Sequence, residues 1–418
     1  MYYIMGNVKP KELSPFIFIP LLSLIFIRPF LSGLAYPLLE IYYQNCVILL
    51  AILSLFSYIN HCEQGKIVFM RFSYALPILL FLSAYILSSI FSINPQNSIK
   101  ETIKFISYVS IFYLVLQSGD KQKQSLVKVV ILAGLLISIY AIYQYFWGYQ
   151  HTLLYLKKIQ SSFLLTSSYA RDILVAKRAI GTFPSPNLLG GYLTIILFLT
   201  LHRFQRSRAY IILPITFALL LTKSLGAAIS LILTLILASF FFYNSLKKRK
   251  LLLIALSIFI IIALIFITLS RWDRIIDLDN PQNSISQRLL YWKTASGIIK
   301  EHPVFGVGPG NFQDVFLQYK QGTGTDSRYA HNIFLHMWSE TGILGVSGIL
   351  YLIIIFLKKC AIKYEYRFIS LGVIAFLLHN LIDNSYFIPQ TGIFFWIMIA
   401  IVLSQVSDLA KKPHPIRS

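Results

Sequence analysis

Apolar runs of about 20 residues recur along the whole chain, and they restrict its possible folds more than any other feature. Of the 418 residues, 56% are hydrophobic and only 13% are charged, whereas soluble domains carry about 25% charged residues. A helix of about 20 apolar residues matches the thickness of a bilayer. The sequence therefore predicts an all-α polytopic membrane protein, with residues 1–418 forming a single integral membrane domain.

The apolar runs predict about twelve spans, and the positions of Lys and Arg predict their orientation. Cations gather near both ends of the chain and in the even-numbered connections, for example in Lys247–Lys250. The positive-inside rule therefore places both termini in the cytoplasm. Cations between spans favour contact with anionic lipids rather than nucleic acid, despite the net charge of +21. The predicted spans are 13–29, 41–59, 73–92, 101–118, 125–146, 187–202, 209–222, 225–243, 251–270, 331–357, 366–387 and 390–407.

Two connections are long, 147–186 and 271–330, and the predicted orientation places both on the outer side of the membrane. In the larger loop, the sequence predicts a helix over 287–300 capped by Ser286, and a second helix capped by Asn311 that runs to Lys320. Both helices are predicted to be amphipathic and to lie on the membrane surface. A similar stretch occupies 153–175 in the smaller loop. Because long ordered loops are usually functional, we expect the function on these two loops.

His331 is the leading candidate for chemistry, because it is predicted to lie in the first turn of a helix on the outer side. The positive end of the helix and nearby arginines disfavour imidazolium, so the ring is expected to be neutral near pH 7. A neutral imidazole can accept a proton from an incoming hydroxyl group. The alternative is an interfacial histidine that only anchors the end of a helix.

Three cations on the outer side are candidates for binding an anionic group. Arg288 lies at the start of the first loop helix, and its guanidinium offers a planar fork of donors suited to phosphate. Arg178 lies near the end of the smaller loop, and Lys223 lies in a tight turn between two spans. The alternatives are contacts with lipid headgroups for the arginines and snorkelling for the lysine.

The acidic residues near these candidates have different expected roles. Glu340 follows His331 by nine residues, which is 2.5 turns and about 13 Å along a helix, so we expect a buried contact between helices there. Asp383 and Asn384 lie near the outer end of a span, and they either approach the site or occupy a solvated turn. The sequence has no Walker-type loop, no nucleophile elbow and no paired cysteines, so neither a metal nor a cofactor is expected.

With these residues in their order and topology, the chain resembles the O-antigen ligase and polymerase superfamily of bacterial membrane glycosyltransferases, which are of the GT-C type. The resemblance covers nearly all of the chain. One departure is that members usually carry Ser-Arg-Gly where this chain has Ser224-Leu225-Gly226, so Lys223 is the candidate for the missing cation. The matching segments are Phe91–Ser98, Gly181–Asn187, Arg288–Trp292, Pro303–Gly308, Ala330–Asn332 and Glu340–Gly345.

The resemblance implies metal-independent, inverting transfer of a glycan from undecaprenyl pyrophosphate to an acceptor hydroxyl, on the periplasmic side of the bacterial inner membrane. His331 would be the base, and Arg288 would hold the donor pyrophosphate. The expected activity is that of an O-antigen ligase in lipopolysaccharide biosynthesis, with lipid A-core as acceptor. The alternatives are an O-antigen polymerase and, from another class, a transporter or flippase of lipid-linked sugars. The other candidate donor-binding residues are Lys223 and Arg178, and the supporting residues are Asn332 and Asp383.

Overall fold

The computed structural model describes residues 12–33, 35–60, 72–158, 173–174, 177–202, 209–241, 258, 261–262, 265, 283–321, 326–360 and 366–404. In these ranges every regular element is a helix, which confirms the predicted all-α class. The helices of the first part are α1 (Pro15–Ile27), η1 (Arg28–Phe30), α2 (Pro37–Asn60), α3 (Phe72–Ile90), α4 (Pro95–Gln117), α5 (Asp120–Tyr143), the π-helical η2 (Gln144–Gly148) and α6 (Tyr149–Lys158). Those of the second part are α9 (Pro186–His202), α10 (Ala209–Leu221), α11 (Leu225–Phe241), α15 (Ser284–Glu301), α16 (Phe312–Tyr319), α17 (Ile333–Cys360), α18 (Arg367–His379) and α19 (Pro389–Ser404).

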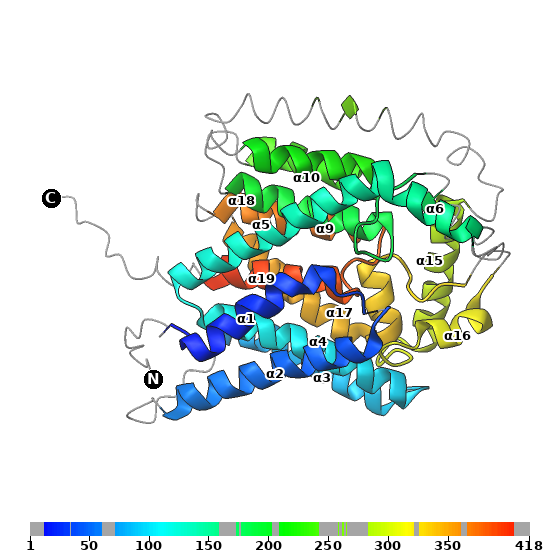
Figure 1. Cartoon of the computed structure of the whole chain (residues 1–418). Coiled ribbons are helices and arrows are strands. Elements are labelled where there is room, and N and C mark those ends of the chain that lie inside the picture. The colour runs from blue at the N-terminus through cyan, green and yellow to red at the C-terminus, as the bar shows by residue number, and fades with distance from the viewer. Residues whose placement is uncertain are drawn as a thin grey trace.

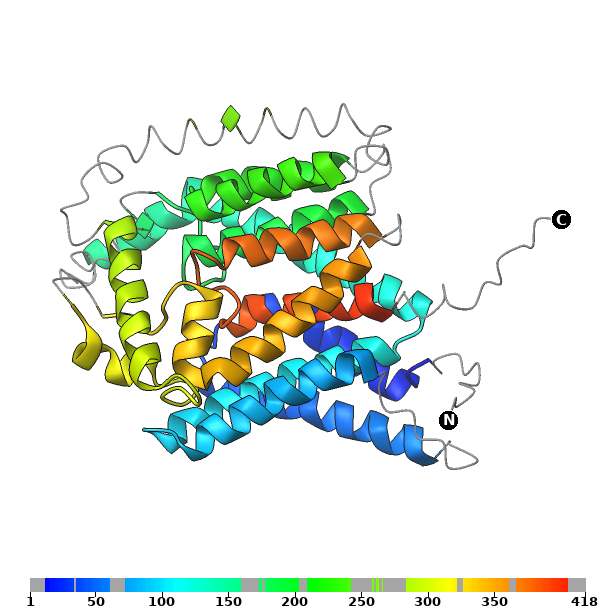
Figure 2. The same cartoon turned by 180° about the vertical axis from the view of Figure 1, so that it is seen from behind.

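Most of these helices run side by side as a bundle, and α15 lies across one end of it with α16 beside it (Figures 1 and 2). Among the described residues, three helical stretches are long and apolar enough to cross a membrane, namely Pro37–Ile59, Asp120–Leu154 and Ile333–Lys359. Helices occur at eleven of the twelve predicted spans, although several are shorter than expected. The remaining predicted span, 251–270, lies almost wholly outside the described residues. The count of twelve spans therefore stays a prediction.

Proline residues start several helices of the bundle. The helices α1, α2, α4, α9 and α19 each begin at a proline. The first four N–H groups of a helix have no partner within it, so a proline at the start removes no helical hydrogen bond. The fixed φ angle of proline also suits the helix. These prolines therefore define where the apolar stretches become helical.

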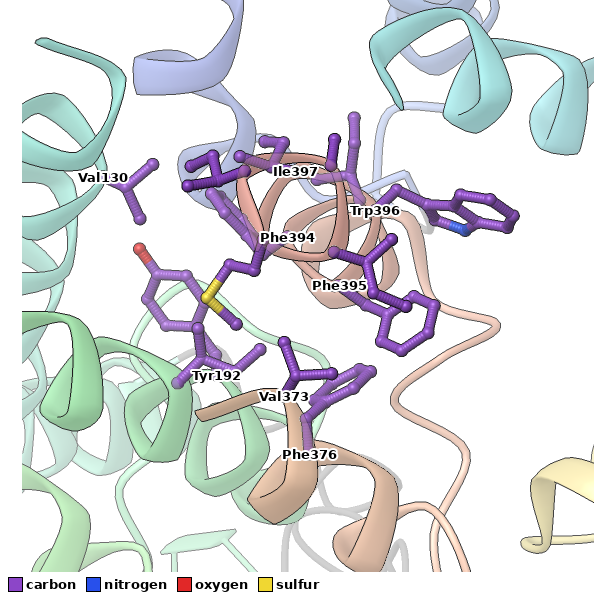
Figure 3. Close-up of a cluster of buried hydrophobic side chains, with 14 of the residues drawn as sticks. Val130, Tyr192, Val373, Phe376, Phe394, Phe395, Trp396 and Ile397 are labelled. Carbon is purple, nitrogen blue, oxygen red and sulfur yellow. The ribbon is translucent and has the colours of Figure 1, made fainter. Parts of the chain in front are cut away.

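The helix α19 lies at the centre of the bundle, and every residue from Gln390 to Leu403 is buried. An apolar surface on every side of a helix is compatible with a position enclosed by other helices. Figure 3 shows the packing around α19, where Phe394 meets Tyr192 of α9 and Phe395 meets Phe376 of α18. The other helices are therefore arranged around α19.

The two helices of the larger loop pack their apolar faces on each other. Their buried side chains form a second small core, which also includes Ala330 from the segment before α17. The predicted contact of both helices with a membrane surface stays a prediction. The residues of this core are Leu290, Tyr291, Ala295, Ile298, Val307, Phe312, Val315, Phe316 and Ala330.

Three predicted helix ends were wrong. The helix α15 is capped by Asn283, whose side chain accepts from the amide of Ile285 at 2.8 Å, so Ser286 lies inside the helix. The helix α18 ends at His379, which leaves the following residues, up to 388, as a compact turn. The helix α17 starts at Ile333, so His331 precedes it. In each case a side chain or turn close to the boundary competes successfully with the apolar pattern.

Asn311 lies at the predicted N-cap position of α16, but its side chain does not cap that helix. Its Nδ2 atom instead donates to Ser92 Oγ at 2.7 Å and to the carbonyl of Val307 at 3.0 Å. Asn311 thus ties the turn before α16 to the end of α3 and the start of α4. The expected cap is replaced by a contact between segments far apart in the sequence.

A break at Gly342 divides α17 and fastens the larger loop to it. Gly342 has φ 66° and ψ −169°, which interrupts the helical hydrogen bonds. The carbonyls of Ser339 and Glu340 instead accept hydrogen bonds from the amides of Val307 and Gly308, each at 3.0 Å. The turn that follows α15 is therefore attached directly to the broken helix.

We predict that Gly342→Ala destabilises the folded protein strongly. An added Cβ atom would lie 1.9 Å from the carbonyl oxygen of Val304, and residues other than glycine are excluded from this backbone conformation at a cost of about 1–3 kcal/mol. Gly297→Ala is the matched control, since its added Cβ would lie 3.4 Å from the ring of Tyr319, an ordinary contact. Thermal unfolding in detergent should show a lower midpoint for the first variant only. Equal midpoints would contradict this account of the break.

Candidate functional site

His331 lies in the turn just before α17, in a left-handed backbone conformation with φ 51°. Its half-buried ring stacks on Tyr291 of α15, with centroids 5.5 Å apart and planes 25° apart. Its Nδ1 atom is buried and has no hydrogen-bond partner among the described residues. The ring is therefore oriented by its backbone and by stacking.

Burial lowers the pKa of His331 to about 4, with Asp383 opposing the shift and Arg288 adding to it. The imidazole is therefore neutral at pH 7, as the sequence predicted. The main cause differs from the predicted one, because removal from water, rather than the helix end, has the largest effect. A neutral, half-buried imidazole retains a lone pair that can accept a proton.

Arg288 is brought to the same place by α15, and the 380–388 turn holds its guanidinium. Its Nε atom donates to the carbonyl of Ile382 at 2.6 Å, and its Nη2 atom lies 3.7 Å from Asp383 Oδ2. Nη1 donates to the carbonyl of Ser284 within its own helix at 3.0 Å. The Arg288 side chain remains 20% exposed, and these contacts use three of the five N–H donors of its guanidinium. It can therefore bind an anion without leaving its present partners.

Asp383 approaches the site rather than lying in a solvated turn, and it is only 2% exposed. Burial by itself raises the pKa of its carboxyl, but the electrostatic effects of His379, His331 and Arg288 outweigh burial and lower that pKa. The carboxylate also accepts a hydrogen bond from the amide of Asn384 at 2.9 Å. Asp383 is thus a buried negative charge that contacts Arg288 and interacts electrostatically with His331.

Asn332 supports the turn that carries His331. Its Oδ1 atom accepts from the amides of Phe334 and Leu335, each at 3.0 Å, so Asn332 caps α17. Its Nδ2 atom donates to the carbonyl of Leu381 at 3.0 Å. One side chain therefore starts α17 and joins it to the turn that holds Asp383.

Arg178 and Lys223 lie together in a separate group at the start of α11. Arg178 is buried, and it donates to the carbonyl of Thr222 at 3.0 Å and to Asn187 Oδ1 at 2.8 Å. Lys223 has φ 50°, and its ammonium lies 5.9 Å from the ring centroid of Tyr145. These contacts give Arg178 a structural role between α9 and the turn that follows α10. A role for either cation in donor binding stays a prediction.

His379, which the sequence reasoning missed, connects the two groups. It is fully buried, with its Nε2 atom 3.9 Å from Asp383 Oδ1. Its ring packs against Gly191 of α9 and Gly226 of α11, where an added Cβ would lie 2.7 Å and 3.2 Å from it. The glycine of the Ser224-Leu225-Gly226 triplet thus makes room for a histidine. Its position inside a predicted span was the available signal, because ionisable residues there are functional by default.

Glu340 makes the buried contact between segments that the sequence predicted. Its Oε1 atom accepts from the amide of Phe312 at 3.2 Å, and its Oε2 atom lies 3.5 Å from His336 Nε2. His336 was also missed, although it too lies inside a predicted span. Within the described ranges, no three His, Cys, Asp or Glu side chains gather as a metal site requires.

Residues 209–350 match a family model described as O-antigen ligase. The matched segment contains Lys223, Arg288, His331 and Asn332, whereas Arg178 and Asp383 lie outside it. Comparison with curated proteins gave no match.

Proposed function

We propose that the chain, whose residues 209–350 match a family model described as O-antigen ligase, transfers O-antigen polysaccharide from undecaprenyl pyrophosphate to a sugar hydroxyl of lipid A-core. The reaction takes place on the periplasmic side of the bacterial inner membrane, in a bundle of about twelve spans with both termini in the cytoplasm. The observation that carries the proposal is the grouping of a neutral His331 with Arg288 and Asp383. It supplies a base, an anion-binding cation and a charge that stabilises imidazolium.

In the proposed reaction, His331 accepts the proton of the acceptor hydroxyl as that oxygen attacks the anomeric carbon. The bond between this carbon and the pyrophosphate oxygen breaks, and its electron pair leaves with the pyrophosphate. A single displacement of this kind inverts the anomeric configuration. Arg288 and Lys223 stabilise the charge that develops on the leaving group. Asp383 stabilises the imidazolium formed on His331.

The pKa of His331, which burial lowers to about 4, determines its strength as a base in the free enzyme. An imidazole with so low a pKa is a weak base. The His331 ring therefore stays unprotonated before substrate binds. The pyrophosphate donor brings negative charge beside the ring, and nearby negative charge raises the pKa of imidazole. Binding of the donor therefore strengthens the base.

A transporter of lipid-linked sugars is less well supported than an enzyme. It would need ionisable side chains along a path through the bundle. His331, Arg288 and Asp383 instead lie together at one end, beside α15. An O-antigen polymerase would use the same site with a different acceptor, so the acceptor assay below separates it from a ligase.

We predict that purified protein given a lipid-linked glycan transfers it to lipid A-core and not to a second carrier-linked glycan. Product analysis by gel electrophoresis and mass spectrometry distinguishes the two acceptors. His331→Ala should abolish transfer because it removes the base, and the loss of stacking on Tyr291 should lower the midpoint of thermal unfolding only slightly. Use of the carrier-linked acceptor would identify a polymerase. Substantial transfer by the alanine variant would rule out His331 as the base.

We predict that the rate of transfer falls at acidic pH. The pH at which it falls should depend on whether the donor is bound. Protonated His331 cannot accept a proton, so activity is lost as pH falls through its pKa. The profile of kcat/KM reports the free enzyme and should fall near pH 4. The profile of kcat reports the complex and should fall at higher pH, because the donor's charge favours imidazolium. Coincident limbs in steady-state assays would contradict the effect of the donor.

We predict that Arg288→Ala raises the KM for the lipid-linked donor by about 10- to 100-fold, the effect of losing one hydrogen bond to a charged group. Lys223→Ala should raise the same KM if this lysine replaces the missing arginine. Lys293→Ala is the matched control, because Lys293 is an exposed lysine on α15. Unfolding midpoints show whether loss of the Arg288 contacts with Asp383 weakens the fold. A normal KM in Arg288→Ala would exclude it as a donor-binding residue.

A further inference from the structure

The turn that carries His331 is held from both sides. Its φ of 51° lies in the left-handed region, which disfavours every residue except glycine, so the turn persists only where neighbouring contacts impose it. On the C-terminal side, Asn332 supplies the hydrogen bonds described above. On the N-terminal side, the amide of Ala330 donates to the Nδ1 atom of His336 at 3.4 Å. His336 therefore contacts the residue immediately before His331.

The ring of His336 is fixed inside an aromatic cage. The side chain is 1% exposed, and the ring centroids of Phe387, Tyr329 and Phe312 lie 4.3, 5.2 and 5.3 Å from that of His336. The imidazole cannot turn without displacing at least one of these rings, since interiors are close-packed. Its two nitrogen atoms therefore keep their present directions.

The two nitrogen atoms of His336 have separate partners. Because the Ala330 amide is a donor, Nδ1 must offer a lone pair, which leaves the proton on Nε2. Nε2 faces Glu340 Oε2 at 3.5 Å, and the other oxygen of Glu340 accepts from the amide of Phe312 at 3.2 Å. A continuous line of contacts thus joins the start of α16, through Glu340 and His336, to the amide of Ala330.

We propose that His336 is a positioning residue for the transfer reaction. Its Nδ1 atom fixes the amide of Ala330, and the backbone fixed in this way aims the His331 ring at the acceptor hydroxyl. The inference rests on the proposed function, in which His331 is the base. The backbone is important for the orientation of the His331 ring because its Nδ1 atom has no hydrogen-bond partner among the described residues. A misplacement of about 1 Å can cost about 100-fold in rate.

Two substitutions separate the tasks of the two nitrogen atoms. In His336→Asn, the amide oxygen can occupy the position of Nδ1 and still accept from Ala330. In His336→Gln, the amide reaches the position of Nε2 and leaves the Ala330 amide without its acceptor. We expect the Gln variant to lose about 10- to 100-fold in kcat with little change in donor KM, and the Asn variant to lose no more than about threefold. If the Gln variant does not accumulate, His336→Ala removes the same acceptor and replaces it in the comparison.

A second measurement does not depend on activity. Diethyl pyrocarbonate modifies neutral imidazole, so its rate of reaction with the half-buried His331, followed by peptide mass spectrometry, reports the environment of that ring. This rate should change in the Gln variant and match the wild-type rate in the Asn variant. His202→Gln, at the end of α9, is the control for loss of a remote histidine.

Three results would overturn the positioning role. They are equal losses of kcat in the Asn and Gln variants, a wild-type kcat in the Gln variant, and a modification rate of His331 that the Gln variant leaves unchanged. Failure of the proposed function has a different signature. There, His331→Ala retains transfer while the modification rates of the two His336 variants still differ.

Discussion

The arrangement of the site depends on a helix that breaks. At Gly342 the backbone of α17 leaves helical geometry, and the carbonyls of Ser339 and Glu340 become available to the turn after α15. Buried polar backbone groups must be paired, because leaving one without a partner is costly. The carbonyl groups freed by the break accept hydrogen bonds from the amides of the turn. As a result α15, which carries Arg288, and α17, which follows His331, have fixed relative positions.

Much of the helical architecture could be predicted from the sequence, because apolar runs and prolines act locally. Helices occur at eleven predicted spans, and several begin at a proline. The errors occur where a nearby side chain decides the boundary. Asn283 rather than Ser286 caps α15, and Asn332 starts α17 two residues later than predicted, which leaves His331 in a turn. A change of two residues matters there, because it frees His331 from helical geometry.

The site was only partly predictable, because its contacts join distant segments. His331 and Arg288 could be chosen as candidates from residue type and position. The contact of Arg288 with Asp383 depends on how α15 crosses the bundle. Hydrophobic periodicity does not predict this crossing. The neutrality of His331 was predicted, but its main cause, burial, depends on packing with Tyr291. His336 and His379 were missed because each was taken as part of an apolar span.

The central position of α19 has a consequence for how the protein is made. This helix comes late in the sequence, yet residues of α5, α9 and α18 pack around it (Figure 3). During synthesis, the earlier helices enter the membrane before their central partner exists. The side chains that these helices turn toward α19 are mostly apolar, so lipid can cover them during this interval. The bundle can therefore close around its centre only after α19 has been synthesised, which makes closure a late event of biogenesis.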